Sequence, residues 1–156
     1  MIEQDLVKFL KEKELTIGSV ESFTAGLFSS LIAGVPGASS VLRGGLITYQ
    51  TDVKTVLLDI PSEEIKLHGV VSKEIARAMA VNGRKKLGVD ICVSFTGNAG
   101  PTALDLLPVG RLFIGISTSS TTNVYEVQMD NMDRNRIREE ASLKAMELVM
   151  ELLRKN

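Results

Sequence analysis

The sequence predicts an α/β protein, a three-layer α/β/α sandwich in which two layers of helices enclose a mixed sheet. Segments with helical spacing of apolar residues alternate with short strand-like segments over the first two thirds of the chain. Two further strand-like segments, 110–118 and 123–129, are joined by a polar turn and predict an antiparallel pair. The 156 residues contain no repeat or linker, so we expect one domain, 1–156.

The first half of the chain supplies two strands and four helices. The expected elements are helix 2–12, strand 15–20, helix 24–33, strand 44–50, helix 51–58 and a short helical segment from Pro61. Thr51 or Asp52 is the expected cap of helix 51–58. Helix 24–33 has no charged residue, so we expect it to be covered by the sheet and, in an oligomer, by another subunit.

The second half begins with a well-marked helix and strand. The expected elements are helix 72–87 ended by Gly88, strand 89–95, strands 110–118 and 123–129, and helix 133–153. Strand 89–95 is almost wholly apolar and rich in β-branched residues, which predicts a central strand covered on both faces. Cys92 lies within it and is expected to be a buried, unreactive thiol.

Composition argues against several classes of protein. With 18 basic and 19 acidic residues and a net charge of -1, the chain has no basic cluster for nucleic acid. One cysteine and one histidine make a zinc site improbable, and we expect no metal and no cofactor. The N-terminus lacks signal-peptide features, and the uncharged segment 22–42 is too interrupted to cross a membrane. We therefore expect a soluble, cytoplasmic protein.

Three loops are candidates for a ligand site, because ligands of open α/β sheets gather at the carboxyl ends of strands. These loops are 21–26, 48–54 and 96–101. In the first, a hydroxyl between a strand and a helix could act as a nucleophile, with helix-start N–H groups holding an anion or oxyanion. Ser22 or Thr24 could equally be the N-cap of that helix.

A Ser-Lys pair is the catalytic arrangement that the residues favour, since the only histidine, His68, lies outside these loops. Lys54 is the best-placed lysine, and burial would favour its neutral amine. Tyr49 could relay or orient a proton. Lys54 could instead be an ordinary solvated helix residue. The loop 96–100 could cradle a phosphate through its amides or form only a tight turn, and Arg134 could contact phosphate.

Motifs over nearly the whole chain resemble the C-terminal domain of the CinA (competence/damage-inducible) family. The matching stretches are Ser19–Gly26, Val35–Ser40, Gly44–Lys54, His68–Ser72, Thr96–Pro101, Pro108–Gly110, and Asp133-Arg134 with Arg138. Stand-alone members of this family include PncC-type nicotinamide-nucleotide amidases. The resemblance implies a three-layer α/β/α domain, a homo-oligomer and metal-independent hydrolysis of nicotinamide mononucleotide to nicotinic acid mononucleotide and ammonia.

The resemblance also implies roles for individual residues. Ser22 would be the nucleophile, Lys54 its activator and Tyr49 a supporting residue, with oxyanion-stabilising amides between Thr24 and Gly26. The nucleotide end would be held by Thr96, Gly97, Gly100 and Arg134. An alternative is a non-catalytic member that binds a nucleotide or a protein partner. It is motivated by Phe23 and Ala25, where the family motif resembles Glu-Ser-Cys-Thr-Gly-Gly, and by the glycine-free segment 102–107.

Overall fold

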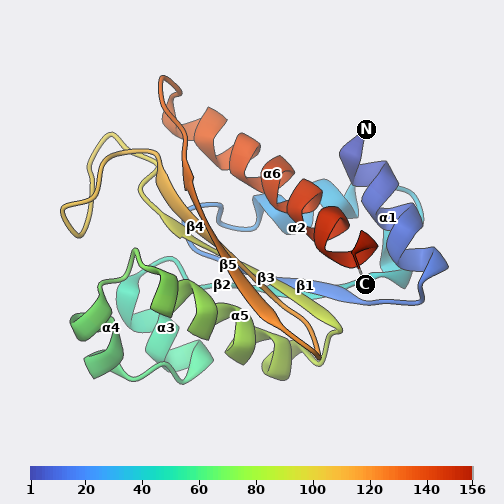
Figure 1. Cartoon of the computed structure of the whole chain (residues 1–156), viewed down its shortest axis with the longest axis horizontal. Coiled ribbons are helices and arrows are strands. Elements are labelled where there is room, and N and C mark those ends of the chain that lie inside the picture. The colour runs from blue at the N-terminus through green and yellow to red at the C-terminus, as the bar shows by residue number, and fades with distance from the viewer. Residues whose placement is uncertain (156) are drawn as a thin grey trace.

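The computed structural model describes residues 1–155, which form a five-stranded sheet between two layers of helices (Figure 1). The strands are β1 (Ile17–Glu21), β2 (Leu42–Ile47), β3 (Ile91–Gly97), β4 (Arg111–Ser117) and β5 (Thr122–Gln128). Their order across the sheet is β2-β1-β3-β4-β5. The pairs β2–β1 and β1–β3 are parallel, whereas β3–β4 and β4–β5 are antiparallel. The mixed sheet predicted from the sequence is confirmed.

The helices divide between the two faces of the sheet. One layer holds α1 (Ile2–Glu12), α2 (Leu27–Ala33) and α6 (Arg134–Arg154), and the other holds α3 (Thr51–Leu58), α4 (Ser62–His68) and α5 (Lys73–Leu87). A short 3₁₀ turn, η1 (Ala38–Ser40), precedes β2. The predicted three-layer sandwich is therefore confirmed, with β1 and β3 at its centre, where both faces are covered and the strands are buried throughout most of their length.

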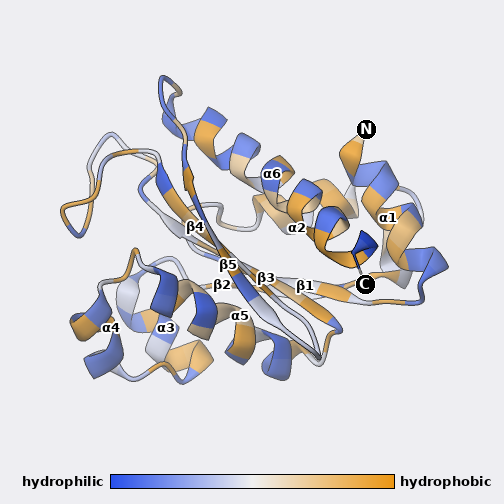
Figure 2. Cartoon of the chain, viewed as in Figure 1, coloured by the Kyte–Doolittle hydropathy of each residue, from blue (hydrophilic) through white to orange (hydrophobic). Residues whose placement is uncertain are grey.

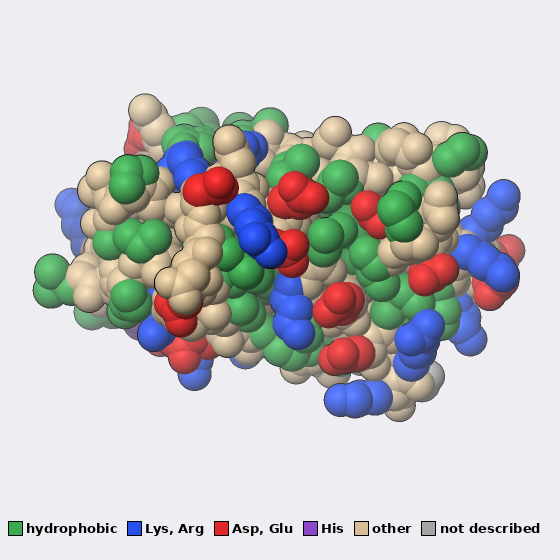
Figure 3. All heavy atoms as spheres, turned by 90° about the horizontal axis from the view of Figure 1, so that it is seen from above, with side chains coloured by type: hydrophobic (Ala, Val, Ile, Leu, Met, Phe, Trp, Pro, Cys, Tyr) green, Lys and Arg blue, Asp and Glu red, His purple; other side chains and the backbone are tan. Residues whose placement is uncertain are grey.

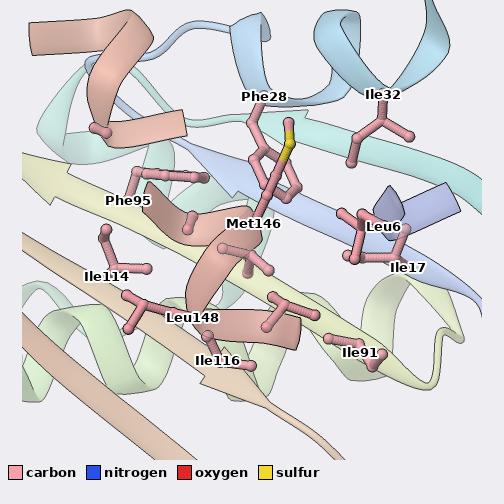
Figure 4. Close-up of a cluster of buried hydrophobic side chains, with 14 of the residues drawn as sticks. Leu6, Ile17, Phe28, Ile32, Ile91, Phe95, Ile114, Ile116, Met146 and Leu148 are labelled. Carbon is pink, nitrogen blue, oxygen red and sulfur yellow. The ribbon is translucent and has the colours of Figure 1, made fainter. Parts of the chain in front are cut away.

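The main core lies between the sheet and the layer of α1, α2 and α6. Phe28, Phe95 and Met146 meet there with aliphatic side chains from the sheet (Figure 4). On α1 and α6, hydrophobic and hydrophilic residues alternate along the ribbon (Figure 2), and the buried residues of both helices are mainly apolar, as expected when apolar area is removed from water. On the other face, α5 approaches the sheet closely at Gly83, where a Cβ atom would lie 2.2 Å from Val20.

Cys92 faces the α5 side of the sheet and has no exposed surface. Burial raises the pKa of its thiol to about 12, so the thiolate is strongly disfavoured. The predicted burial of this cysteine is confirmed, and Cys92 lies near the start of β3, away from the carboxyl ends of the strands.

Several elements differ from the prediction in their bounds or in their cap. The helix expected over 24–33 begins only at Leu27, because Ala25 and Gly26 have positive φ angles of 49° and 95°. The strand expected over 44–50 is Leu42–Ile47, and Thr48 to Gln50 form a loop. The cap of α3 is Gln50, which makes no side-chain cap, so neither Thr51 nor Asp52 has the predicted capping position.

The uncharged helix α2 is covered largely within its own chain. Phe28 and Ile32 are fully buried, and Leu31 packs against the same core. The covering elements are α1, α6 and the sheet. A second subunit is therefore not needed to shield α2, and the homo-oligomer remains a prediction without that support.

The surface over the α1, α2 and α6 layer mixes both signs of charge. Figure 3 shows Lys and Arg side chains interspersed with Asp and Glu on this face, without a basic stripe. Across residues 1–155, no helix has the length and apolar character needed to cross a membrane. The same residues contain no group of three or more His, Cys, Asp or Glu side chains that could hold a metal ion.

Candidate active site

The three loops predicted to converge lie together at the carboxyl ends of three neighbouring strands. Because β2, β1 and β3 are parallel neighbours, their carboxyl ends lie side by side. A cavity of about 120 Å³ opens there. Its lining residues are Ser22, Phe23, Tyr49, Gly97, Asn98, Ala99, Gly100, Thr102, Leu104 and Arg134. Residues from all three loops and from the start of α6 thus surround one space.

Ser22 and Lys54 form a hydrogen-bonded pair at these strand ends. Lys54 Nζ donates to Ser22 Oγ at 3.3 Å and to the Thr48 carbonyl oxygen at 2.6 Å. The Lys54 side chain has no exposed surface, and burial lowers the pKa of its ammonium from 10.5 to about 8. Among the described residues no carboxylate forms an ion pair with Lys54. A lysine in this environment supplies a neutral amine near neutral pH far more readily than a solvated one.

Ser22 lies in a tight turn between β1 and α2, and the turn is held by the preceding residue. Glu21 Oε1 accepts hydrogen bonds from the N–H groups of Gly26 and Phe28 at 3.1 and 3.0 Å, and Oε2 accepts from Ser29 N at 3.1 Å. Glu21 is therefore the side chain that caps α2. The sequence left open whether Ser22 or Thr24 is the N-cap of this helix, and neither side chain caps it. The Ser22 hydroxyl is therefore available to Lys54.

The helix-start amides are distributed differently from the prediction. Gly26 N donates to Glu21, and Ala25 N donates to the Ser22 carbonyl at 3.1 Å. Within residues 1–155, the N–H groups of Phe23 and Thr24 have no protein acceptor. Of the amides from Thr24 to Gly26 that were expected to stabilise an oxyanion, those of Ala25 and Gly26 are therefore already engaged. The amides of Phe28 and Ser29 at the start of α2 likewise donate to the Glu21 carboxylate, so they are not free to bind a phosphate.

Arg138 holds the Ser22 turn from the opposite side. From α6, its Nε donates to the Phe23 carbonyl at 2.9 Å and its NH2 group to the Thr24 carbonyl at 3.0 Å. With Glu21, it is one of two residues whose part in the site the sequence did not reveal. The available signals were a carboxylate directly before the serine and an arginine one helical turn after Arg134.

Tyr49 and Arg134 meet at the mouth of the cavity. An Arg134 NH2 group donates to the Tyr49 hydroxyl, and NH1 donates to the Gly100 carbonyl. The Ser22 hydroxyl contacts Tyr49 only through its backbone carbonyl, at 3.5 Å. The phenol is therefore engaged with the arginine and not with Ser22 or Lys54, although a proton-orienting role had been expected for it.

The loop that follows β3 is rigidly tied. The Thr96 hydroxyl donates to the Val70 carbonyl at 2.6 Å and is buried, so it is directed away from the cavity. Asn98 is also buried and bridges the backbone of Leu104 and Leu107. At Gly97 a Cβ atom would lie 2.6 Å from Leu112, so this glycine permits the close approach of β4.

Gly100 completes the same loop with a positive φ of 82° and presents its carbonyl to Arg134. Of the residues predicted to bind the substrate, Gly97, Gly100 and Arg134 line the cavity, whereas Thr24, Gly26 and Thr96 do not. Beside the cavity lies an apolar groove of about 740 Å³ between α3 and α4, and both spaces are lined by Tyr49 and Leu104.

Fold and site together define an α/β sandwich in which a serine and a buried lysine of lowered pKa are paired at the carboxyl ends of parallel strands. Residues 1–153 match the CinA C-terminal domain, and the chain belongs to the CinA family.

Relatives by sequence agree with this assignment. The competence-damage inducible proteins of Listeria welshimeri and Streptococcus uberis are 40% and 42% identical over 155 and 152 residues, which is 99% and 97% of this chain. The chain spans only 37% and 36% of their lengths.

Two solved structures share the fold over almost their full lengths. The competence/damage inducible protein CihA of Agrobacterium tumefaciens has a TM-score of 0.92 and 25% identity, covering 97% of this chain and 93% of the other. A CinA superfamily protein of Klebsiella pneumoniae has a TM-score of 0.96 and 18% identity, with 99% and 97% covered.

Proposed function

We propose that the protein is a cytoplasmic amidohydrolase that converts nicotinamide mononucleotide to nicotinic acid mononucleotide and ammonia. The observation that carries the proposal is the pairing of Ser22 Oγ with Lys54 Nζ at 3.3 Å, in a place where burial lowers the lysine pKa to about 8. This is the chemistry that a serine nucleophile needs when no histidine is near.

In the first half of the reaction, neutral Lys54 accepts the Ser22 proton as Oγ attacks the carboxamide carbon. In this proposal the developing oxyanion accepts hydrogen bonds from the N–H groups of Phe23 and Thr24, which have no acceptor among residues 1–155. The Lys54 ammonium then returns its proton to the leaving nitrogen, the C–N bond breaks, and ammonia departs. Ser22 is left as an ester of the carboxyl group.

In the second half, water replaces ammonia. Lys54, again neutral, accepts a proton from the water as its oxygen attacks the ester carbon. The ester bond to Ser22 breaks, and the proton passes from Lys54 to Oγ. The product is the carboxylic acid, and the enzyme returns to its starting state with no metal or cofactor in the scheme.

Arg134 is the proposed contact for the 5′-phosphate. It is exposed at the cavity mouth, already oriented by Tyr49 and Gly100, and its guanidinium geometry suits a phosphate. The cavity of about 120 Å³ is smaller than the roughly 300–1,000 Å³ of typical ligand sites. The carboxamide end therefore enters the cavity while the ribose phosphate lies toward its mouth.

The test is a comparison of two amides. Purified protein is expected to release ammonia from nicotinamide mononucleotide and much more slowly from nicotinamide riboside, which lacks the phosphate. Arg134→Ala should raise KM for the nucleotide and leave the rate of ammonia release from the riboside unchanged. If the wild type releases no ammonia from the nucleotide under conditions in which an active relative does, the proposal is wrong.

A nucleotide-binding role without turnover is the second candidate, favoured by two observations. Phe23 is one of the residues that line the small cavity, and Ala25 occupies a backbone position of positive φ that suits glycine better. Calorimetry that detects binding of nicotinamide mononucleotide, together with absence of ammonia release, would support this role over the first.

A further inference from the structure

A buried polar network lies directly behind the Ser22 turn. Glu21 is 1% exposed, and its Oε2 accepts hydrogen bonds from Ser19 Oγ at 2.7 Å and Ser29 Oγ at 2.9 Å. The two hydroxyls also lie 2.7 Å from each other. With the three backbone donors from the start of α2, the carboxylate receives five hydrogen bonds. Among the described residues it has no cationic partner.

The same residue is linked to the other half of the catalytic pair through its backbone. The Glu21 carbonyl accepts a hydrogen bond from Thr48 N at 2.8 Å. The Thr48 carbonyl in turn accepts from Lys54 Nζ at 2.6 Å. Glu21 therefore connects by its side chain to the turn that carries Ser22, and by its main chain to the group that orients Lys54. Glu21 is thus joined by hydrogen bonds to the surroundings of both members of the pair.

The neighbouring strand β2 closes the network at Gly45. A Cβ atom at this position would lie 2.8 Å from both Ser19 Oγ and Ser29 Oγ. Real Cβ atoms do not approach hydroxyl oxygens so closely, and a side chain here would force the two serines away from Glu21. The adjacent Gly44 differs, because its Cβ would meet only Leu87, at 3.7 Å.

We propose that Ser19, Glu21 and Ser29, enclosed by Gly45, form a positioning network that sets the distance between Ser22 and Lys54. Glu21 is its central positioning residue and touches neither substrate nor reacting atoms. The proposal rests on the amidohydrolase function for its kinetic consequences, whereas its structural consequences can be measured without turnover.

The sharpest test compares Gly45→Ala with Gly44→Ala. Gly45→Ala is expected to lower kcat by about 10–100-fold with KM nearly unchanged, because displacement of about 1 Å at reacting groups has effects of that size. Gly44→Ala keeps the wild-type kcat. Wild-type kcat in Gly45→Ala, or an effect carried by KM alone, would overturn the proposal.

A double-mutant cycle separates the network from general strain in β2. In a Ser19→Ala/Ser29→Ala background the hydroxyl oxygens that oppose the new methyl group are absent. Gly45→Ala should then have little further effect on kcat. An undiminished effect in that background would contradict the proposed contact. Glu21→Gln, which places an amide donor against serine and backbone donors, should lower kcat at least as much as Gly45→Ala.

Hydrogen exchange decides the proposal even if the protein releases no ammonia. The amides of Gly26, Phe28 and Ser29 are protected by Glu21, so they should exchange faster in Gly45→Ala than in Gly44→Ala, while α5 amides exchange equally in both. Equal exchange of the three amides in the two variants overturns the network. If the wild type releases no ammonia, only the proposed amidohydrolase function is overturned, and the positioning network is still decided by the exchange rates.

Discussion

At the scale of single residues, the Lys54 environment links stability to activity. An ammonium group without exposed surface is disfavoured, so the folded protein lowers the pKa to about 8 while the unfolded chain keeps 10.5. The unfolded chain therefore binds more protons between these values, and stability rises with pH across that window. Below about pH 8 the folded protein holds Lys54 as a buried ammonium, and the full free-energy cost of burying that charge lowers its stability. This cost falls on the residue whose neutral amine the proposed reaction requires.

The pH dependence of the reaction follows from the same pKa. Only neutral Lys54 accepts the Ser22 proton, so kcat/KM for nicotinamide mononucleotide is expected to increase as pH rises through about 8 and then to level off. Initial rates between pH 6 and 10 measure this. A profile that is flat through pH 8, or that falls there, would exclude Lys54 as the base.

Ala25 gives a prediction about stability at a single backbone position. Its φ of 49° is unfavourable for a residue with a Cβ atom, so Ala25→Gly is expected to be neutral or to stabilise the fold by up to about 1 kcal/mol. The matched control is Ala33→Gly at the end of α2, where helical φ makes glycine worse by up to about 1 kcal/mol. Urea unfolding measures both, and equal destabilisation would contradict the strained turn.

Sequence reasoning at this scale identified side chains whose chemistry is visible in the residue type. Ser22 and Lys54 stand out in that way, and the order of the CinA family motifs along the chain suggested that they form a pair. Glu21 and Arg138 did not stand out, because most of their partners are backbone groups of a turn whose positive-φ conformation the residue types do not reveal. Tyr49 was expected beside the lysine, but the direction of its ring depends on Arg134, which is distant in sequence.

At the scale of elements, α6 supports the site through its first turns. Arg138 binds the Phe23 and Thr24 carbonyls, whereas Arg136, two residues earlier, is exposed. Arg138→Ala is expected to lower kcat by about 10-fold or more, because the turn loses one of its two anchors. Arg136→Ala should leave kcat unchanged. Kinetics of both variants, with circular dichroism to verify folding, provide the measurement, and equal kcat values would refute the anchoring role.

Element boundaries were predicted less well than element types. Apolar periodicity identifies the buried face of a helix or strand but not the residue at which hydrogen bonding changes. The start of α2 illustrates the reason. The uncharged segment from Thr24 reads as continuous helix, yet the Glu21 carboxylate takes the Gly26 and Phe28 amides and fixes the helix start beyond Gly26.

At the scale of the whole molecule, the fold was predictable because alternation of strands and helices leaves few arrangements. Connections in a parallel sheet require helices on its faces, and the polar turn at 119–122 requires an antiparallel pair. Both features are present. The meeting of the three loops could be expected only if β2, β1 and β3 were parallel neighbours, and the strand order supplies that condition.

Self-association is a further prediction for the molecule as a whole. Several apolar side chains on α3, α4 and the segment before β4 are strongly exposed, among them Val56, Leu67 and Leu106. Apolar surface of this kind favours association. Light scattering is expected to give a mass that is a multiple of 16.9 kDa, and Leu67→Glu should reduce it. A mass of one chain at all concentrations would contradict the homo-oligomer.

The central claim is that Ser22, activated by Lys54, is the nucleophile of an amide hydrolysis. The most direct measurement is the rate of ammonia release from nicotinamide mononucleotide at pH 9 by wild type, Ser22→Ala and Lys54→Met. The account predicts turnover by the wild type and a loss of roughly 10³-fold or more in each variant, without additivity in the double variant, because the pair acts as one unit. Wild-type turnover by Ser22→Ala would contradict it.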